Sequence, residues 1–296
     1  MPIAVVTGAS RGLGKALAEA LARAGYRTYA AMRQVGTRNA EAAEAMANLA
    51  DAEAITLRTV EMDVTSDASV DAAIAHVLRA EGRIDVAVNN AGRGAHGVLE
   101  AFTVDQLREE IDLGVLSMQR LNRAVLPTMR SQGAGLLVHI SSVTGRTVTP
   151  LRGVYHIAKH AVEALAETYR YELSQFGIDS VIIEPGPFET GAHGRVALPD
   201  APQIQAQYGE LAGGREVAMA GFNRMFADPS VPTDPQIFVD EVMRIIATPA
   251  GQRPLRTTVG VDMGVGAFNE AAAVFNHRAM QLMGLAHLEH MPPAKT

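Results

Sequence analysis

The sequence predicts an α/β protein whose parallel β-sheet is covered by helices on both faces. Two observations carry this prediction. Short apolar runs alternate with longer, alanine-rich amphipathic stretches over residues 1–190, which is typical of strand–helix–strand units. Several runs, such as IAVVT and DSVIIE, are nearly continuous in Val and Ile, as expected for strands buried on both faces. We therefore expect a doubly wound parallel sheet with right-handed connections, formed by a single domain.

The apolar runs and the stretches between them predict where each strand and helix lies in the sequence. The predicted strands are 3–7, 28–32, 55–60, 84–89, 135–141, 179–184 and 256–261. The predicted helices are 12–24, 39–51, 66–81, 104–131, 152–176 and 234–247. The pattern loosens over 191–232, which is either a mobile lid over a pocket or an irregular surface segment. We expect one domain over residues 1–264 and a tail over 265–296, helical in pattern as far as residue 291, that packs on the body or on another subunit.

The composition excludes several classes of function. The net charge of −6 argues against a nucleic-acid binder, which usually presents a basic face. The chain contains no cysteine, so it has no disulfide, thiol nucleophile or thiolate metal site. The N-terminal apolar run is too short for a signal peptide, and no apolar run approaches the ~20 residues that span a bilayer. We therefore expect a cytoplasmic protein that binds neither nucleic acid nor a membrane.

A glycine-rich turn follows the first predicted strand. The segment TGASRGLG places three glycines where a strand passes into a helix. The pyrophosphate of a dinucleotide needs close backbone approach, free N–H groups and a helix N-terminus, and such a turn offers all three. The spacing differs from G-x-G-x-x-G, and glycine suits any tight turn, but the position after the N-terminal strand favours nucleotide binding. The expected contact residues are Gly8, Ser10, Arg11, Gly12, Leu13 and Gly14.

The end of the second predicted strand bears on the choice between NAD(H) and NADP(H). An NAD-binding site usually places an acidic residue there for the ribose 2′-hydroxyl, whereas this sequence has Met32 followed by Arg33. Arg11 adds a second cation, and the planar guanidinium group suits a phosphate. The alternative is that both arginines are solvated surface residues. The sequence favours NADP(H), and NAD(H) stays open as the other cofactor.

Two further turns at the same edge of the predicted sheet carry candidate cofactor contacts. Asp63 follows the third strand, where its carboxylate either accepts a hydrogen bond from the adenine amine or caps the helix that starts near Ser66. NNAG follows the fourth strand, and ligands of open α/β sheets bind at the carboxyl ends of the strands. As a bare tetrapeptide it is otherwise only a turn. The candidates in these turns are Asp63, Val64, Asn90, Ala91 and Gly92.

Ser142, Tyr155 and Lys159 have the chemistry needed at a carbonyl or carbinol carbon. Ser142 ends the fifth strand region, and the other two stand four residues apart on one helical face. Free tyrosine, with a pKa of about 10, is a poor base at neutral pH, but a nearby ammonium group stabilises the phenolate. Serine can hold the substrate oxygen while tyrosine exchanges its proton and hydride moves to or from a nicotinamide. These three are the expected catalytic residues.

Taken together, these motifs resemble the short-chain dehydrogenase/reductase superfamily in its single-domain branch. TGASRGLG, NNAG, EPGPFET and the spacing of Ser142, Tyr155 and Lys159 follow the family's order over residues 3–190. We expect a Rossmann-like sheet of seven parallel strands in the order 3-2-1-4-5-6-7. The resemblance implies that Lys159 also holds the nicotinamide ribose, so Tyr155 and Lys159 count among the cofactor contacts, and that the region 191–232 is a substrate lid.

The resemblance also implies further contacts, an activity and an assembly. In the family, the Pro-Gly segment after the sixth strand contacts the nicotinamide end of the cofactor. The stretch that follows Tyr155 is similar to hydroxysteroid and retinol dehydrogenases and related ketone reductases. We therefore expect an NADP(H)-dependent enzyme that interconverts a ketone or aldehyde and its alcohol, on an apolar small molecule. The family often pairs its two long helices, here 104–131 and 152–176, which implies a homodimer or homotetramer. The added cofactor contacts are Pro185, Gly186, Phe188 and Thr190.

One position departs from the family pattern. An asparagine in the long helix before the fifth strand usually helps to hold a water in a proton relay to the lysine, and Gly114 stands in its place. Glycine costs up to about 1 kcal/mol in a helix interior and has no side chain to hold water. Either backbone carbonyls hold the water, or the relay is altered, or turnover is weak. The last reading leaves a dinucleotide-binding sensor or regulator as the alternative function.

A pair of histidines beside Tyr155 raises the question of a metal. His156 and His160 are four residues apart on one helical face. A metal site needs further ligands, and the sequence offers no evident third one. We expect solvated or interface histidines and no metal.

Overall fold

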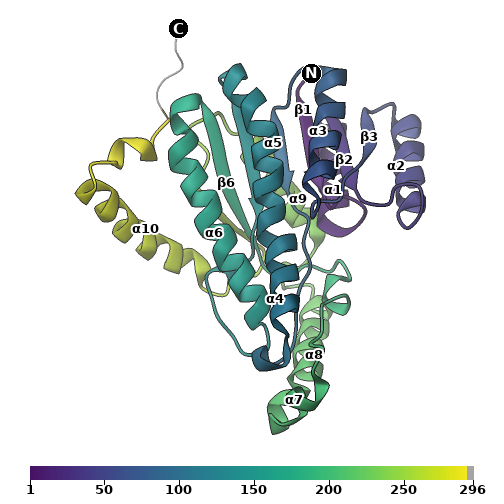
Figure 1. Ribbon diagram of the computed structural model, residues 1–296, viewed down its shortest axis with the longest axis vertical. Helices are drawn as coiled ribbons and strands as arrows, with labels where there is room; N and C mark the ends of the chain where they lie inside the picture. Colours follow the sequence, from purple (N-terminus) through teal and green to yellow (C-terminus); the bar gives the residue numbers. More distant parts are fainter. Residues whose placement is uncertain (292–296) are drawn as a thin grey trace.

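Seven parallel strands form one sheet in the computed structural model, which describes residues 1–291 (Figure 1). The order β3-β2-β1-β4-β5-β6-β7 confirms the predicted topology. The strands are β1 (Ile3–Thr7), β2 (Arg27–Met32), β3 (Leu57–Glu61), β4 (Val86–Asn89), β5 (Gly135–Ile140), β6 (Ile178–Pro185) and β7 (Arg256–Val259). The order changes direction between β1 and β4, which is where open α/β sheets bind their ligands.

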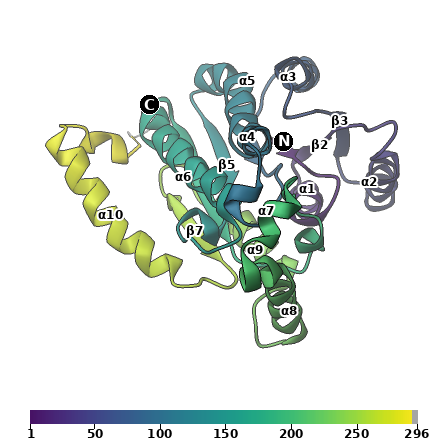
Figure 2. The same ribbon diagram turned by 60° about the horizontal axis from the view of Figure 1, so that its bottom comes forward.

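Helices cover both faces of this sheet (Figures 1 and 2). Because successive strand residues point to opposite faces, Ala4 and Val6 of β1 enter one core while Val5 enters the other. Burial on both faces explains the unbroken apolar run that precedes Thr7. One face carries α1 (Gly12–Arg23), α2 (Ala40–Glu53) and α9 (Pro235–Ala247), and the other carries α3 (Asp67–Glu81), α5 (Ser117–Gln132) and α6 (Gly153–Leu173).

The long helix between β4 and β5 is interrupted. In place of the predicted continuous helix 104–131, the chain forms α4 (Val104–Ile111), a π-helical segment over Asp112–Leu116, and then α5. The prediction was wrong in this detail, because a π turn inserts an extra residue that the apolar periodicity does not show. Gly114 lies buried in the π segment, and a Cβ atom there would stand 3.3 Å from Ala158 Cβ on α6. The glycine therefore sits where the two long helices approach each other closely.

The segment 191–232 projects beyond the carboxyl ends of the strands. It contains α7 (Pro202–Ala206) and α8 (Gly214–Ala227), which lie at the bottom of Figure 1. The alternative of an irregular surface segment was therefore wrong, since α8 alone runs for 14 residues. The mobility of this segment as a lid stays a prediction.

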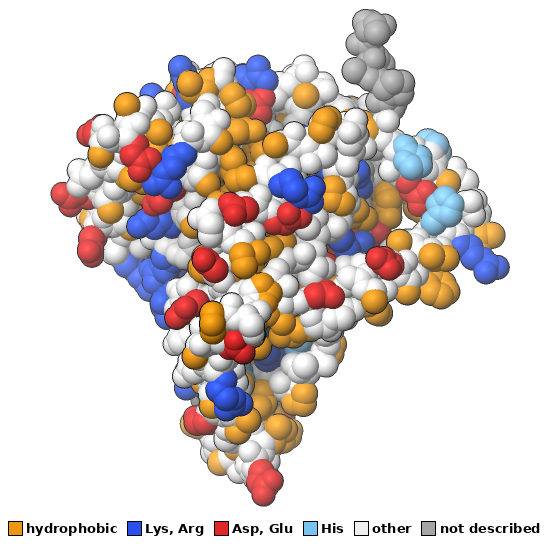
Figure 3. Space-filling model, turned by 180° about the vertical axis from the view of Figure 1, so that it is seen from behind, with side chains coloured by type: hydrophobic (Ala, Val, Ile, Leu, Met, Phe, Trp, Pro, Cys, Tyr) orange, Lys and Arg blue, Asp and Glu red, His pale blue; other side chains and the backbone are white. Residues whose placement is uncertain are grey.

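The tail leans away from the rest of the molecule. It forms α10 (Val265–Leu282), which projects from the side of the molecule (Figures 2 and 3) and contacts α6 through Asn276, whose Nδ2 donates to Glu167 Oε1 at 2.8 Å. Asn269 ties it to the body, because its Nδ2 donates to Oε2 of the buried Glu184 at 2.6 Å. Within residues 1–291, no helix combines the length and apolarity needed to cross a membrane. The predicted tail residues 292–296 lie outside the described residues.

Asp179 on β6 is fully buried and paired with two arginines. Its Oδ2 lies 2.7 Å from Arg253 Nη1 and accepts a hydrogen bond from the Gly251 N–H at 3.0 Å, while its Oδ1 pairs with Arg170. Asp179→Asn removes the charge that both guanidinium groups need, and breaking such a buried pair is strongly destabilising. We expect urea denaturation to show a loss of about 3–5 kcal/mol in the free energy of unfolding.

An exposed ion pair supplies the control for this prediction. Arg23 Nε lies 2.7 Å from Glu53 Oε2 on the surface. Glu53→Gln should leave the urea midpoint unchanged, because water and salt screen exposed pairs. An Asp179→Asn variant as stable as this control would contradict the structural role given to Asp179.

Candidate active site

A pocket of about 840 Å³ opens at the carboxyl ends of the strands. Loops that follow β1 to β6 and the start of α6 contribute its walls. The structure thus brings together residues that are far apart in the sequence and that were each expected to act in catalysis or cofactor binding. All of them line this one pocket: Gly8, Ser10, Arg11, Gly12, Leu13, Gly14, Arg33, Asp63, Val64, Asn90, Ala91, Gly92, Ser142, Tyr155, Lys159, Pro185, Gly186, Phe188 and Thr190. Their individual roles stay predictions.

The glycine loop is packed directly on the turn after β4. Gly8 has a φ of +65°, and a Cβ atom on it would lie 2.8 Å from Ala91 Cα. A Cβ atom on Gly14 would lie 2.3 Å from Asn90 Nδ2 and 2.7 Å from the Gly8 carbonyl oxygen, closer than any side chain tolerates. Asn90 Nδ2 in turn donates to the Thr7 carbonyl at 2.8 Å. Two of the three glycines are therefore required by contact with the protein's own backbone, and the N-terminus of α1 is left facing the pocket.

The β2 end of the pocket is cationic. Arg33 and Arg38 both line it and are exposed, and Asn39 Nδ2 holds this turn by donating to the Arg33 carbonyl at 2.6 Å. The sequence analysis missed Arg38, because the loop after β2 has no periodic pattern that shows which side chains turn inward. Asp63 is the acidic group facing this end, and the charges of Arg33 and Arg120 act on it.

Asp63 does not cap the following helix. Ser66 is the N-cap residue of α3, since its hydroxyl accepts a hydrogen bond from Ser69 N at 3.3 Å. Asp63 Oδ1 accepts instead from Thr65 N at 3.0 Å and Thr65 Oγ1 at 2.7 Å. Burial alone would raise the pKa of Asp63, but the Thr65 hydrogen bonds and the nearby arginines outweigh it and lower that pKa. The capping alternative was wrong, and an ionised carboxylate faces the pocket.

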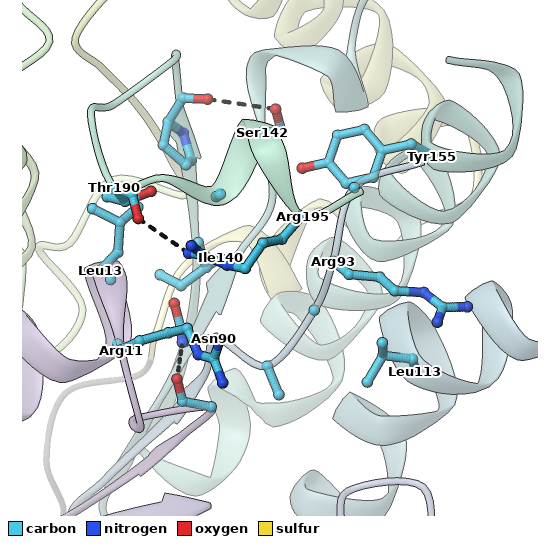
Figure 4. Close-up of a pocket in the computed structure, with 18 of the residues that line it drawn as sticks. Arg11, Leu13, Asn90, Arg93, Leu113, Ile140, Ser142, Tyr155, Thr190 and Arg195 are labelled. Carbon is cyan, nitrogen blue, oxygen red and sulfur yellow. Dashed lines mark hydrogen bonds between the residues drawn. The ribbon is translucent and has the colours of Figure 1, made fainter. Parts of the chain in front are cut away.

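Ser142, Tyr155 and Lys159 meet at the β5 end. In Figure 4 the Ser142 and Tyr155 hydroxyls both point into the pocket. Lys159, one turn along α6, is buried with its Nζ 5.7 Å from the centroid of the Tyr155 ring. Its ammonium group donates to the Ile140 carbonyl at 2.7 Å, and Ser142 Oγ donates to the Pro185 carbonyl at 3.4 Å. The Lys159 ammonium group and the Ser142 hydroxyl are thus held by backbone carbonyls at the ends of β5 and β6.

A second cation stands on the Tyr155 ring. The guanidinium carbon of Arg152 lies 5.1 Å from the ring centroid, within cation–π range. The sequence analysis missed Arg152, although it stands three residues before Tyr155, a spacing that brings side chains together on a helix. Arg93 also lines the pocket, but it is neutralised by Glu109 and by the buried Glu110. Arg195 crosses the pocket and donates to the Thr190 carbonyl at 3.1 Å (Figure 4).

His156 has a structural position behind the site. Its Nε2 accepts from Thr149 N at 3.0 Å, and its Nδ1 lies 3.0 Å from the Thr144 carbonyl. Burial is the main cause that lowers the pKa of His156, so the ring is neutral and bridges the loop between β5 and α6. In residues 1–291 no group of three or more His, Cys, Asp or Glu side chains could hold a metal ion. The expectation of a solvated or interface pair was wrong for His156, which is buried.

Comparison with known proteins agrees with this architecture. A family model described as short chain dehydrogenase matches residues 2–199. The chain is 32% identical over 189 residues to a 3-ketodihydrosphingosine reductase from Bacteroides thetaiotaomicron, a match that covers 64% of this chain and 65% of that protein. It is 31% identical over 267 residues to human retinol dehydrogenase 8, covering 87% of this chain and 81% of the relative.

A solved structure shows the same fold over nearly the whole chain. The structure of a short-chain dehydrogenase from Streptomyces avermitilis superposes with a TM-score of 0.73 at 30% identity, covering 96% of this chain and 97% of the other. The family model spans well over half of the sequence, and the strand order is the one that the motifs predicted. The chain therefore belongs to the short-chain dehydrogenase family.

Proposed function

We propose that this protein is an oxidoreductase that uses NADP(H) to interconvert a ketone or aldehyde and the corresponding alcohol. The observation that carries the proposal is the arrangement at the β5 end of the pocket. A phenol hydroxyl and a serine hydroxyl face one space, and a buried ammonium group lies 5.7 Å from the phenol ring. NADP(H), when bound, supplies or accepts the hydride.

The protein's own residues would manage the proton and the substrate oxygen. In the reducing direction, Tyr155 donates its hydroxyl proton to the carbonyl oxygen as that oxygen gains negative charge. Lys159 stabilises the phenolate that remains, because an opposite charge nearby favours the ionised form. Ser142 exchanges its hydrogen bond to the Pro185 carbonyl for one to the substrate oxygen. The alcohol oxidation runs through the same groups in reverse.

The residues present fit a dinucleotide, and the arginines favour its phosphorylated form. The N-terminus of α1 faces the pocket beside the glycine loop, which suits a pyrophosphate. Arg33 and Arg38 line the pocket after β2, where an NAD site would place an acid. Guanidinium groups bind phosphate oxygens bidentately. We infer that these two arginines hold the 2′-phosphate and that Arg11 stands nearby as a third cation.

Apolar side chains in the pocket lining favour a substrate with an apolar part. Phe222 from α8 and Met263 line the same pocket as Val143 and Leu113. Closure of 191–232 over the substrate would cover this apolar surface.

A homodimer is the proposed assembly. The helices expected to pair across a twofold axis carry exposed apolar side chains, among them Val104 on α4, Leu116 in the π segment and Ile157 on α6. Such side chains on neighbouring helices are typical of a surface that binds a second subunit.

The alternative function is a dinucleotide-binding sensor with little turnover. Gly114 is the observation that favours it, because this position lacks the asparagine that the family pattern leads one to expect. Against it stands the complete set of Ser142, Tyr155 and Lys159 in one pocket. Nicotinamide absorbance during a screen of ketones and alcohols separates the two functions, since a sensor binds the cofactor without consuming it.

Tyr155→Phe tests the acid–base assignment. Removing the hydroxyl should lower kcat, measured by NADPH absorbance, by about 10²- to 10⁴-fold. The Kd for NADPH, measured by fluorescence titration, should stay almost unchanged. Tyr169→Phe on the same helix is the matched control, because its hydroxyl donates to Gln119 Oε1 at 2.7 Å outside the pocket lining. If Tyr155→Phe turns over as fast as the wild type, Tyr155 is not the residue that exchanges the proton with the substrate.

Arg33→Ala and Arg38→Ala test the cofactor choice. Each should raise the Kd for NADPH by about tenfold or more, the equivalent of a lost charge-assisted contact, and should change the Kd for NADH little. NADH is the internal control, because it lacks only the 2′-phosphate. Equal weakening of both cofactors would contradict the assignment of these arginines to that phosphate.

Gly114→Asn tests the missing relay side chain, with Gly114→Ala as its control. A Cβ atom at this position would press on Ala158, so both variants should melt at a lower temperature and neither should gain turnover. A gain of tenfold or more in kcat for the asparagine variant alone would show that the wild-type relay is impaired and would favour the sensor.

A further inference from the structure

Two arginines next to the candidate active site make no ion pair. Arg152 lies against the Tyr155 ring, with 5.1 Å between its guanidinium carbon and the ring centroid. Arg215 stands near the start of α8. Within residues 1–291 neither is paired with a carboxylate, whereas Arg93 in the same region is neutralised by Glu109 and Glu110. The charge at the substrate side of Tyr155 is therefore left uncompensated by the protein.

Backbone contacts bring Arg152, Arg215 and a third residue, His96, to one junction. The Gly97 N–H donates to the Leu151 carbonyl at 2.7 Å. Gly214 lies against the side chain of Leu151, since a Cβ atom on this glycine would stand 2.3 Å from Leu151 Cδ1. The three residues that make these two contacts, Gly97, Leu151 and Gly214, are the immediate neighbours of His96, Arg152 and Arg215. The loop after β4, the start of α6 and the start of α8 thus converge beside Tyr155.

Two polar atoms at this junction are buried without a hydrogen-bond partner. They are Nδ1 of His96, whose residue is only 9% exposed, and Nε of Arg215. Leaving a buried polar group without a partner costs about 1–3 kcal/mol of folding free energy. The two unpartnered atoms, beside the unpaired Arg152 guanidinium group, therefore destabilise the protein until a ligand pairs with them. Burial, followed by the charges of Arg152 and Arg215, lowers the pKa of His96. Glu216 acts on His96 in the opposite direction, but it is exposed and therefore screened by water.

We propose that the substrate carries an anionic group, such as a carboxylate, which binds at this junction to Arg152, Arg215 and His96. An oxyanion offers acceptors to the free Nε–H of Arg215, to the Arg152 guanidinium group and, in the tautomer with hydrogen on Nδ1, to His96. It also offsets the positive charge that both arginines exert on His96. The inference rests on the proposed function in one respect: Tyr155 must act on the substrate oxygen for the anion to lie on the same molecule.

The position of the junction separates this anion from the cofactor phosphates. Arg33 and Arg38 follow β2, whereas Arg152 stands at the β5 side of the pocket. Strands β2 and β5 are three strand spacings apart in the sheet, or about 14 Å. A 2′-phosphate bound after β2 therefore leaves Arg152 free for the substrate. Together with the apolar walls, this describes an amphipathic oxo or hydroxy acid, with its charged end beside Tyr155.

The test compares straight-chain oxo acids with their methyl esters, which keep the ketone and remove the charge. With NADPH, wild-type enzyme should show a kcat/KM about tenfold or more higher for the acid. Arg152→Gln and Arg215→Gln should abolish most of this preference by raising KM for the acid far more than KM for the ester. Arg224→Gln, which removes an exposed charge from the same helix α8, should keep the preference.

Calorimetry gives a second readout that needs no turnover. The NADPH-loaded wild-type enzyme should bind octanoate more tightly than methyl octanoate, and Arg152→Gln and Arg215→Gln should lose that difference while Arg224→Gln keeps it. Equal binding of acid and ester by the wild type, or equal losses for both ligands in the arginine variants, would overturn the anion site. The latter result would mean that Arg152 acts only through the Tyr155 ring. Charge-dependent octanoate binding without reduction of any ketone would support the subsite and overturn the proposed reaction.

Discussion

The contact between the glycine loop after β1 and the turn after β4 is the constraint on which the rest of the site depends. Gly8 and Gly14 leave no room for a Cβ atom against Ala91 and Asn90, and Asn90 bonds back to the Thr7 carbonyl. This contact joins the two halves of the sheet where its order changes direction. It therefore sets how the N-terminus of α1 faces the β5 end of the pocket, and hence how far a bound dinucleotide lies from Tyr155.

Buried polar groups then hold the reacting side chains in place. Lys159 bonds to the end of β5 and Ser142 to the end of β6. His156 bridges the loop between β5 and α6 by bonds to Thr144 and Thr149. Because a buried polar group without a partner is costly, each of these bonds restricts its side chain to few positions. The phenol is thus presented on a rigid helix whose start is anchored on both sides.

The distribution of charge around the pocket divides it into three parts. Arg33 and Arg38 lie at the β2 end, Lys159 is buried behind Tyr155, and Arg152 stands in front of it. Most acids of this region are paired with arginines, since Glu109 and Glu110 pair with Arg93 and Asp112 pairs with Arg120, while Asp63 faces the β2 end. A chain with a net charge of −6 therefore presents positive charge to its ligands, as a cofactor phosphate and an anionic substrate would require.

Local patterns in the sequence were sufficient to predict the parallel sheet and the residues that end its strands, and the resemblance to a known family supplied the strand order. Alternating apolar runs and amphipathic stretches are local patterns, and the parallel arrangement sends every strand's carboxyl end to one edge, so residues such as Ser142 and Asn90 could be assigned to a common site. The π segment at Gly114, the helices within 191–232, the role of Asp63 and the positions of Arg38, Arg152 and Arg215 were decided only by the tertiary structure. These features depend on contacts between segments distant in the chain, such as Gly114 with Ala158 or Gly214 with Leu151, and no local periodicity records such a contact.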